Sequence, residues 1–136
     1  MRSVLQRQAN RRQLLVGGAC TVATALAAGA ALAGEEGAAL TASASLVLHD
    51  PGLPLEAGLQ QRLRANGARL MPLTGDPVRL WRDQLSALLA PRDARLLGVT
   101  RWPDFLMIRG LAAESRRHVR YQRMDARTGV IVWLIA

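Results

Sequence analysis

The sequence predicts an α/β fold, a small three-layer sandwich built on a mainly parallel sheet. Over residues 45–112, short apolar runs typical of buried strands alternate with segments of helical period. This alternation indicates parallel strands joined by right-handed helical crossovers. The chain then changes to two adjacent strand-like segments, which predict a C-terminal antiparallel hairpin.

The first strand is expected at residues 45–49, an apolar run that stops at the turn-forming residues 50–52. A helix should begin at Pro54 and end at Asn66-Gly67, because three leucines recur every four residues on one face; they are Leu55, Leu59 and Leu63. The second strand is expected at residues 68–73.

The clearest local signal is Thr74-Gly75-Asp76-Pro77. Asp is a favoured N-cap and Pro is favoured at the first helical position, so we expect a helix from Pro77 to about residue 90. The third strand is expected at residues 95–100. A third helix should begin at Thr100 or Trp102.

Residues 117–124 alternate between charged and apolar side chains, whereas residues 130–135 are almost wholly apolar. These segments predict strands four and five. The fifth strand is too apolar for a sheet edge and the fourth is too charged for the middle. The expected strand order is therefore 2-1-3-5-4.

The N-terminal segment resembles a bacterial export signal. Four arginines precede an uncharged run that ends in Ala31-Leu32-Ala33, a small-x-small site of the kind a signal peptidase accepts. Arg11-Arg12 followed by Gln13 and two leucines resembles the twin-arginine (Tat) motif, although Asn10 stands where Ser or Thr is usual. The chain thus resembles small Tat-exported bacterial proteins of unknown function.

This resemblance implies a signal peptide at residues 1–33, cleavage after Ala33 and a periplasmic location. Residues 34–44 are expected to be a flexible lead-in, and residues 45–136 a single domain. Two alternatives stay open: an uncleaved signal that anchors the protein in the inner membrane, and lipidation at Cys20. Otherwise, membrane contact is expected only through the signal before cleavage.

Composition excludes several kinds of chemistry. All eighteen basic residues are arginines, four of them in residues 1–33, so Schiff-base chemistry on lysine is excluded and the processed chain has a net charge of +4. Its only cysteine, Cys20, lies in the signal, which leaves no disulfide, thiolate nucleophile or Cys-ligated metal. With histidines only at positions 49 and 118, we expect no metal site and no cofactor.

Candidate site residues follow from the topology, because ligands of such sheets bind beyond the carboxyl ends of the parallel strands. His49 and Asp50 are weak catalytic candidates. The ligand-binding candidates follow strands two and three: Thr74, Asp76, Thr100, Arg101 and Trp102. Each also has a structural interpretation: Asp76 and Thr100 as helix caps, Asp50 as a turn former and Trp102 as a packing residue.

Two functions are compatible with these residues. The first is a non-enzymatic periplasmic accessory or binding module that docks a protein partner or a small anionic ligand at the strand-end cleft. The second is a small enzyme that uses His49 and Asp50 as an acid/base pair while Arg101 holds an anionic substrate. Nucleic acid is not an expected partner of an exported protein. The arginines of residues 116–127 either guard a sheet edge against aggregation or form a docking surface for an acidic partner.

Overall fold

The structure, a computed structural model, describes residue 32 and residues 34–136 of the 136-residue chain. The predicted twin-arginine motif, Cys20 and the residue before the predicted cut therefore lie outside the described residues. Within the described part of the chain, no helix combines the length and apolar character needed to cross a bilayer.

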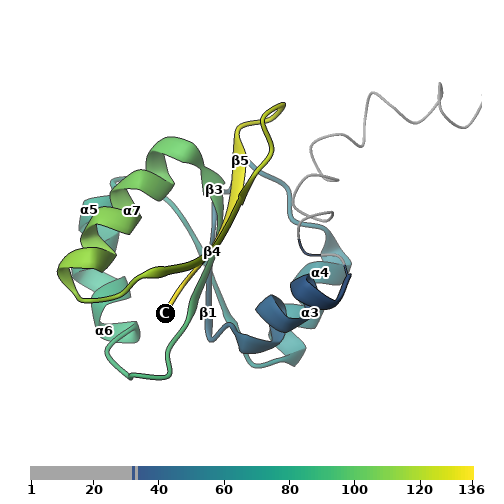
Figure 1. The fold of residues 1–136 in the computed structure, drawn as a ribbon, viewed down its shortest axis with the longest axis horizontal. Coiled ribbons are helices and arrows are strands. Elements are labelled where there is room, and N and C mark those ends of the chain that lie inside the picture. Colours follow the sequence, from purple (N-terminus) through teal and green to yellow (C-terminus); the bar gives the residue numbers. More distant parts are fainter. Residues whose placement is uncertain (1–31, 33) are drawn as a thin grey trace, which may run out of the picture.

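A five-stranded sheet forms the middle layer (Figure 1), in the order β2-β1-β3-β5-β4. β1 pairs in parallel with β2 and β3, whereas β5 pairs antiparallel with β3 and β4. The predicted α/β class, strand order and C-terminal hairpin are confirmed. The strands are β1 (Leu46–His49), β2 (Arg69–Pro72), β3 (Leu96–Arg101), β4 (Val119–Met124) and β5 (Val130–Ile135).

The last strand, β5, lies inside the sheet because both of its faces are apolar. Each of its six residues is at most 5% exposed, and the residues contact helices on both sides. β4 lies at the edge, and its charged side chains reach solvent. Apolarity on both faces of a strand thus decided which strand became central.

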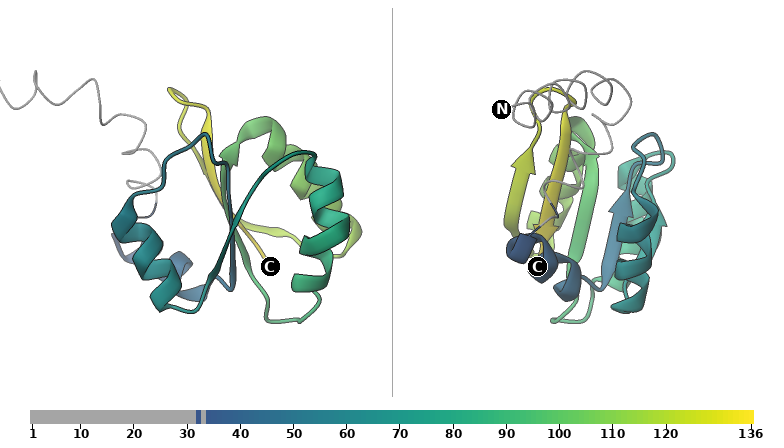
Figure 2. Two further views of the ribbon diagram at one scale, coloured as in Figure 1. Left: turned by 180° about the vertical axis from the view of Figure 1, so that it is seen from behind. Right: turned by 90° about the vertical axis from the view of Figure 1, so that its right-hand side faces the viewer.

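Helices cover both faces of the sheet (Figures 1 and 2). α3 (Gly34–Ser43) and α4 (Ala57–Ala65) lie on one face. The other face carries α7 (Trp102–Glu114) and a helical path of three parts: α5 (Pro77–Leu80), the π-helical turn η1 (Trp81–Leu85) and α6 (Ser86–Leu88). The helix predicted from Pro77 to about residue 90 is therefore interrupted by a π turn and ends slightly earlier.

The expected flexible lead-in at residues 34–44 is instead helical over Gly34–Ser43. Burial explains the difference, because Leu40 and Thr41 of α3 are at most 8% exposed and pack toward the core. Gly37 lies directly against the backbone of Leu32, which is itself 1% exposed. Leu32 thus belongs to the core of the described structure, although it precedes the predicted cut.

Trp133 of β5 sets the packing in the middle of the sheet. Its indole lies directly over Gly98 of β3, where a Cβ atom would overlap the ring. The indole Nε1–H donates a hydrogen bond to Thr100 Oγ1 at 3.0 Å, and the ring packs 5.6 Å from that of Phe105. A glycine at position 98 therefore makes room for the largest side chain of the core.

Candidate functional site

The carboxyl ends of the three parallel strands, β1, β2 and β3, lie together at one end of the sheet. His49, the last residue of β1, pairs with Pro72 of β2 and Val99 of β3. Beyond the strand, the Asp50 amide still donates to the Val99 carbonyl at 3.0 Å. This register brings Asp50 beside the end of β3, where Arg101 is the last residue.

Arg101 and Asp50 form an ion pair through a single nitrogen. Arg101 Nε lies 3.5 Å from Asp50 Oδ2, while the other oxygen of Asp50 accepts the Gly52 amide at 2.8 Å. The arginine side chain is 54% exposed and the aspartate side chain 18%. No hydrogen-bond partner within residues 34–136 engages the two terminal nitrogens of Arg101, so its fork is open to solvent.

Asp104, in the first turn of α7, interacts electrostatically with both of these residues. Desolvation raises the pKa of the Asp104 carboxyl; the negative charge of Asp50 raises it further, and the positive charge of Arg101 opposes the shift. Arg101 thus lies near two carboxylates. We call Asp50, Arg101, Asp104 and the neighbouring His49 the strand-end group.

His49 is half-buried, and desolvation lowers the pKa of its imidazole below 6.5. A backbone hydrogen bond with Asp50 and the Asp50 charge both act in the opposite direction. The lowered pKa favours a neutral ring at neutral pH, able to accept a proton. Of the predicted site residues, the structure therefore brings together His49, Asp50 and Arg101.

Thr100 and Trp102 have structural roles. Thr100 is fully buried; its hydroxyl accepts the Trp133 indole N–H and donates to the Arg101 carbonyl at 3.2 Å. It therefore cannot reach a ligand, which corrects the prediction that it binds one. Trp102 is half-buried and packs against Phe105, with ring centroids 5.5 Å apart.

Thr74 and Asp76 also stay apart from the strand-end group. Asp76 caps α5 by accepting the Val78 amide at 3.0 Å, which is the structural role its position before a proline indicates. Thr74 is exposed. Within residues 34–136, no hydrogen bond or ion pair links either side chain to Arg101 or Asp50.

A second group of polar residues, which is not among the predicted ligand-binding residues, lies at the opposite end of the sheet. Arg92, Arg116, Arg117 and Arg120 line a common cavity there. The sequence predicts that the arginines of residues 116–127 either guard a sheet edge or form a docking surface for an acidic partner. In the structure β4 begins only at Val119, and Arg116 and Arg117 belong to the turn that ends α7. The adjacent pair Arg116-Arg117 directly after the helix was the available signal.

No protein family, curated protein or solved structure was found to match the chain. The evidence for function therefore lies in these two groups of side chains. Within the described residues, no cluster of three or more His, Cys, Asp or Glu side chains is placed to hold a metal ion. The strand-end group can bind through an open guanidinium and can exchange a proton at His49.

Proposed function

We propose that this protein is an exported, non-enzymatic binding module of the bacterial periplasm. Its strand-end group takes a carboxylate or phosphate, presented by a small ligand or by a protein partner. The resemblance of residues 10–15 to a twin-arginine motif supports export. The state of Arg101 supports binding.

The open fork of Arg101 is the observation that carries the proposal. A guanidinium presents parallel N–H groups that match a carboxylate or phosphate in two-point contact. Here Asp50 holds Arg101 through Nε alone, so the side chain is oriented while its terminal nitrogens stay exposed. An arginine that served only the fold would be expected to place both arms of the fork on intramolecular acceptors.

The surrounding charge sets the strength of this binding. Asp50 and Asp104 both lie near Arg101, so the local field is not positive. An anion would be held by the geometry of the fork rather than by long-range attraction. Affinity should therefore be modest and should depend only weakly on salt, because few uncompensated charges contribute.

The test is a calorimetric or NMR titration of the full chain with inorganic phosphate. Arg101→Gln should abolish saturable shifts at the amides of Asp50 and Trp102. Arg64→Gln, at an exposed arginine in the last turn of α4, changes the net charge equally and should leave the shifts intact. Equal shifts in both variants would refute the role of Arg101.

A small enzyme is the second candidate, and the lowered pKa of His49 favours it. A neutral imidazole can act as a general base at neutral pH, with Arg101 holding an anionic substrate. Asp50 is a poor second member of the pair, because Gly52 and Arg101 already engage its two oxygens. Hydrolysis of p-nitrophenyl phosphate that is lost in His49→Gln would favour the enzyme over the binding module.

A further inference from the structure

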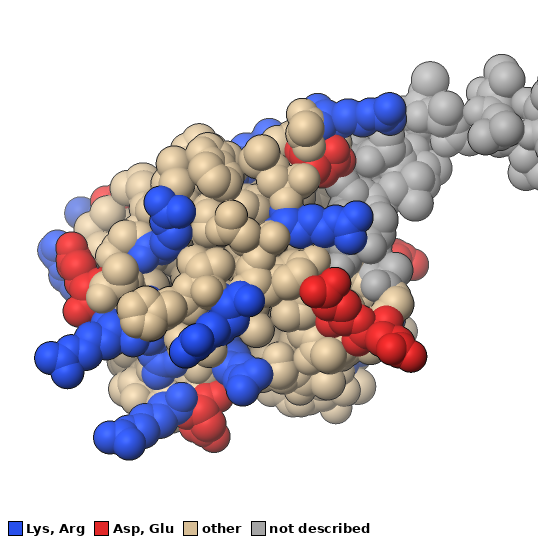
Figure 3. All heavy atoms as spheres, in the orientation of Figure 1, with Lys and Arg blue, Asp and Glu red and all other residues tan. Residues whose placement is uncertain are grey.

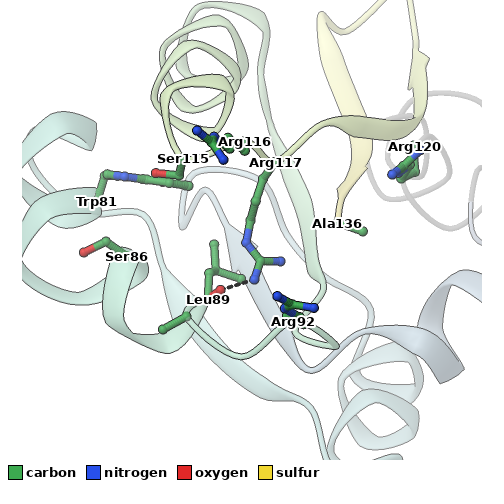
Figure 4. A pocket seen from close by; sticks show the side chains of 10 residues that line it. Trp81, Ser86, Leu89, Arg92, Ser115, Arg116, Arg117, Arg120 and Ala136 are labelled. Carbon is green, nitrogen blue, oxygen red and sulfur yellow. Dashed lines mark hydrogen bonds between the residues drawn. The ribbon is translucent and has the colours of Figure 1, made fainter.

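A cavity of about 540 Å³ opens at the end of the sheet opposite the strand-end group (Figure 4). It lies between the end of α7, the π turn and the loop before β3. Its lining includes Trp81, Ser86, Arg92, Arg116, Arg117 and Arg120. This volume falls within the range of small-molecule sites in proteins.

The polar lining of the cavity is strongly basic. It contains four arginines and no Asp or Glu side chain. Asp93 and Glu114 are neighbours in sequence but do not line it, and within residues 34–136 no carboxylate lies within 4.0 Å of the guanidinium of Arg92, Arg116 or Arg120. In Figure 3, basic side chains gather over this lower part of the molecule with few acidic ones among them.

Arg117 holds the wall of the cavity in place. Its guanidinium donates to the carbonyls of Leu89, Pro91 and Ala94, the last two at 2.6 and 2.7 Å. These carbonyls lie in the segment that follows α6, and the Pro91 carbonyl also accepts the Ala94 amide at 3.1 Å. Arg117 is therefore committed to the fold, and it joins the end of α7 to the loop that carries Arg92.

Arg116 adopts a backbone conformation that its side chain disfavours. Its φ is 58°, and it is the only non-glycine residue with a positive φ in the described part of the chain. The amides of Arg116 and Arg117 donate to the carbonyls of Ala113 and Ala112, the pattern of a Schellman motif whose left-handed position is usually glycine. Such backbone outliers cluster at functional sites, which points to a role for the Arg116 side chain.

The π turn supplies an independent sign of a built site. The Ser86 amide donates to the Trp81 carbonyl five residues earlier, and both residues line the cavity. π turns inside α-helices are uncommon and are frequently found at functional sites. Here the turn places an indole edge and a hydroxyl group on the wall opposite the arginines (Figure 4).

From these observations we propose that the cavity binds a small molecule that carries two or more phosphate or carboxylate groups. Arg116 lies on the side of Trp81, Arg92 lies below Arg117, and Arg120 lies beyond Ala136 on the other side (Figure 4). A molecule with two anionic groups can contact more of these guanidinium groups at once than a single small anion can. The site is separate from the strand-end group and does not rest on its function.

The experiment is a calorimetric titration of the full chain with inorganic pyrophosphate, with inorganic phosphate as the single-anion comparison. Pyrophosphate should bind in the cavity more tightly than phosphate and weaken steeply with salt. Arg116→Gly should weaken it about tenfold or more, the loss of a charge-assisted contact. The same variant should raise Tm by about 4–8 °C, because glycine suits the left-handed position.

A raised Tm together with weaker pyrophosphate binding in Arg116→Gly would separate lost binding from lost folding. Unfolding cannot explain weaker binding by a variant that is more stable. Arg92→Gln and Arg120→Gln should also weaken pyrophosphate. Arg64→Gln, with the same charge change outside the cavity, and Arg101→Gln, at the strand-end group, should not. Undetectable pyrophosphate binding at millimolar concentration, or equal affinity in Arg116→Gly and Arg64→Gln, would overturn the proposal.

Discussion

Replacing Gly98 by alanine should destabilise the domain by adding one methyl group beneath Trp133. The new Cβ would overlap Cε2 and Cζ2 of the indole. The ring has little freedom to move, because its N–H is bonded to Thr100 and its face packs on Phe105. Either the β3–β5 pairing opens or the indole gives up its hydrogen bond.

The expected loss follows from these contacts. Overpacking a core by one methyl group costs about 1–3 kcal/mol, and a lost buried hydrogen bond adds about 1 kcal/mol. Alanine recovers roughly 0.5–1 kcal/mol of backbone entropy relative to glycine. The free energy of unfolding should therefore fall by about 1–3.5 kcal/mol, a measurable share of the roughly 5–15 kcal/mol typical of a domain.

Urea denaturation followed by circular dichroism measures this change, and Gly110→Ala is the matched control. Gly110 lies inside α7, where an added Cβ meets no atom within 4 Å. That variant should gain about 0.5–1 kcal/mol from helix propensity. If Gly98→Ala were as stable as Gly110→Ala, the packing of Trp133 on Gly98 would be wrong.

Three further predictions use other contacts. Arg117→Gln should lower the free energy of unfolding by about 2–4 kcal/mol, because the carbonyls of residues 89–94 lose a charged donor; an unchanged urea midpoint would contradict this. Because the pKa of His49 is lowered in the fold, its stabilising contribution is complete above about pH 6.5 and is lost as the pH falls through the folded pKa. His49→Gln should flatten that part of the stability–pH curve, and an identical curve would argue against desolvation of the half-buried imidazole. Arg11→Lys/Arg12→Lys should retain an unprocessed precursor in the cytoplasm on fractionation, and normal maturation would exclude the twin-arginine route. A chain cut after Ala33 also loses the buried Leu32 and should be about 2–4 kcal/mol less stable than the full chain. Equal stability of the two chains would show that Leu32 contributes nothing.

The sheet could be predicted because each strand carries its position in its own composition. β5 is apolar on both faces and β4 is charged, so their central and edge places follow from burial. Helix α3 could not be predicted in the same way. Its Gly, Ala and Ser composition resembles a linker, and its order comes from packing of Leu40 and Leu32 against the rest of the core.

The candidate site was predictable only where topology decides it. The parallel pairing of β1 with β3 is enough to bring Asp50 next to Arg101. This pairing could be predicted from the sequence, because β1 and β3 were both expected to be parallel strands and neighbours in the sheet. The role of Thr100 depends on Trp133, 33 residues away on another strand, so no local pattern indicates it. The cavity arginines are likewise distant in sequence. They come together because the Arg117 guanidinium, at the end of α7, donates hydrogen bonds to carbonyls of residues 89–94.

The proposed binding function is tested most directly by NMR of the Arg101 guanidinium during a phosphate titration. With phosphate bound to the open fork, the Arg101 Nε–H signal and the Trp102 amide should shift together and saturate with one dissociation constant. The shift should persist in Arg116→Gly, whose substitution lies in the opposite cavity. An Arg101 signal that stays unchanged while other residues shift would contradict the account.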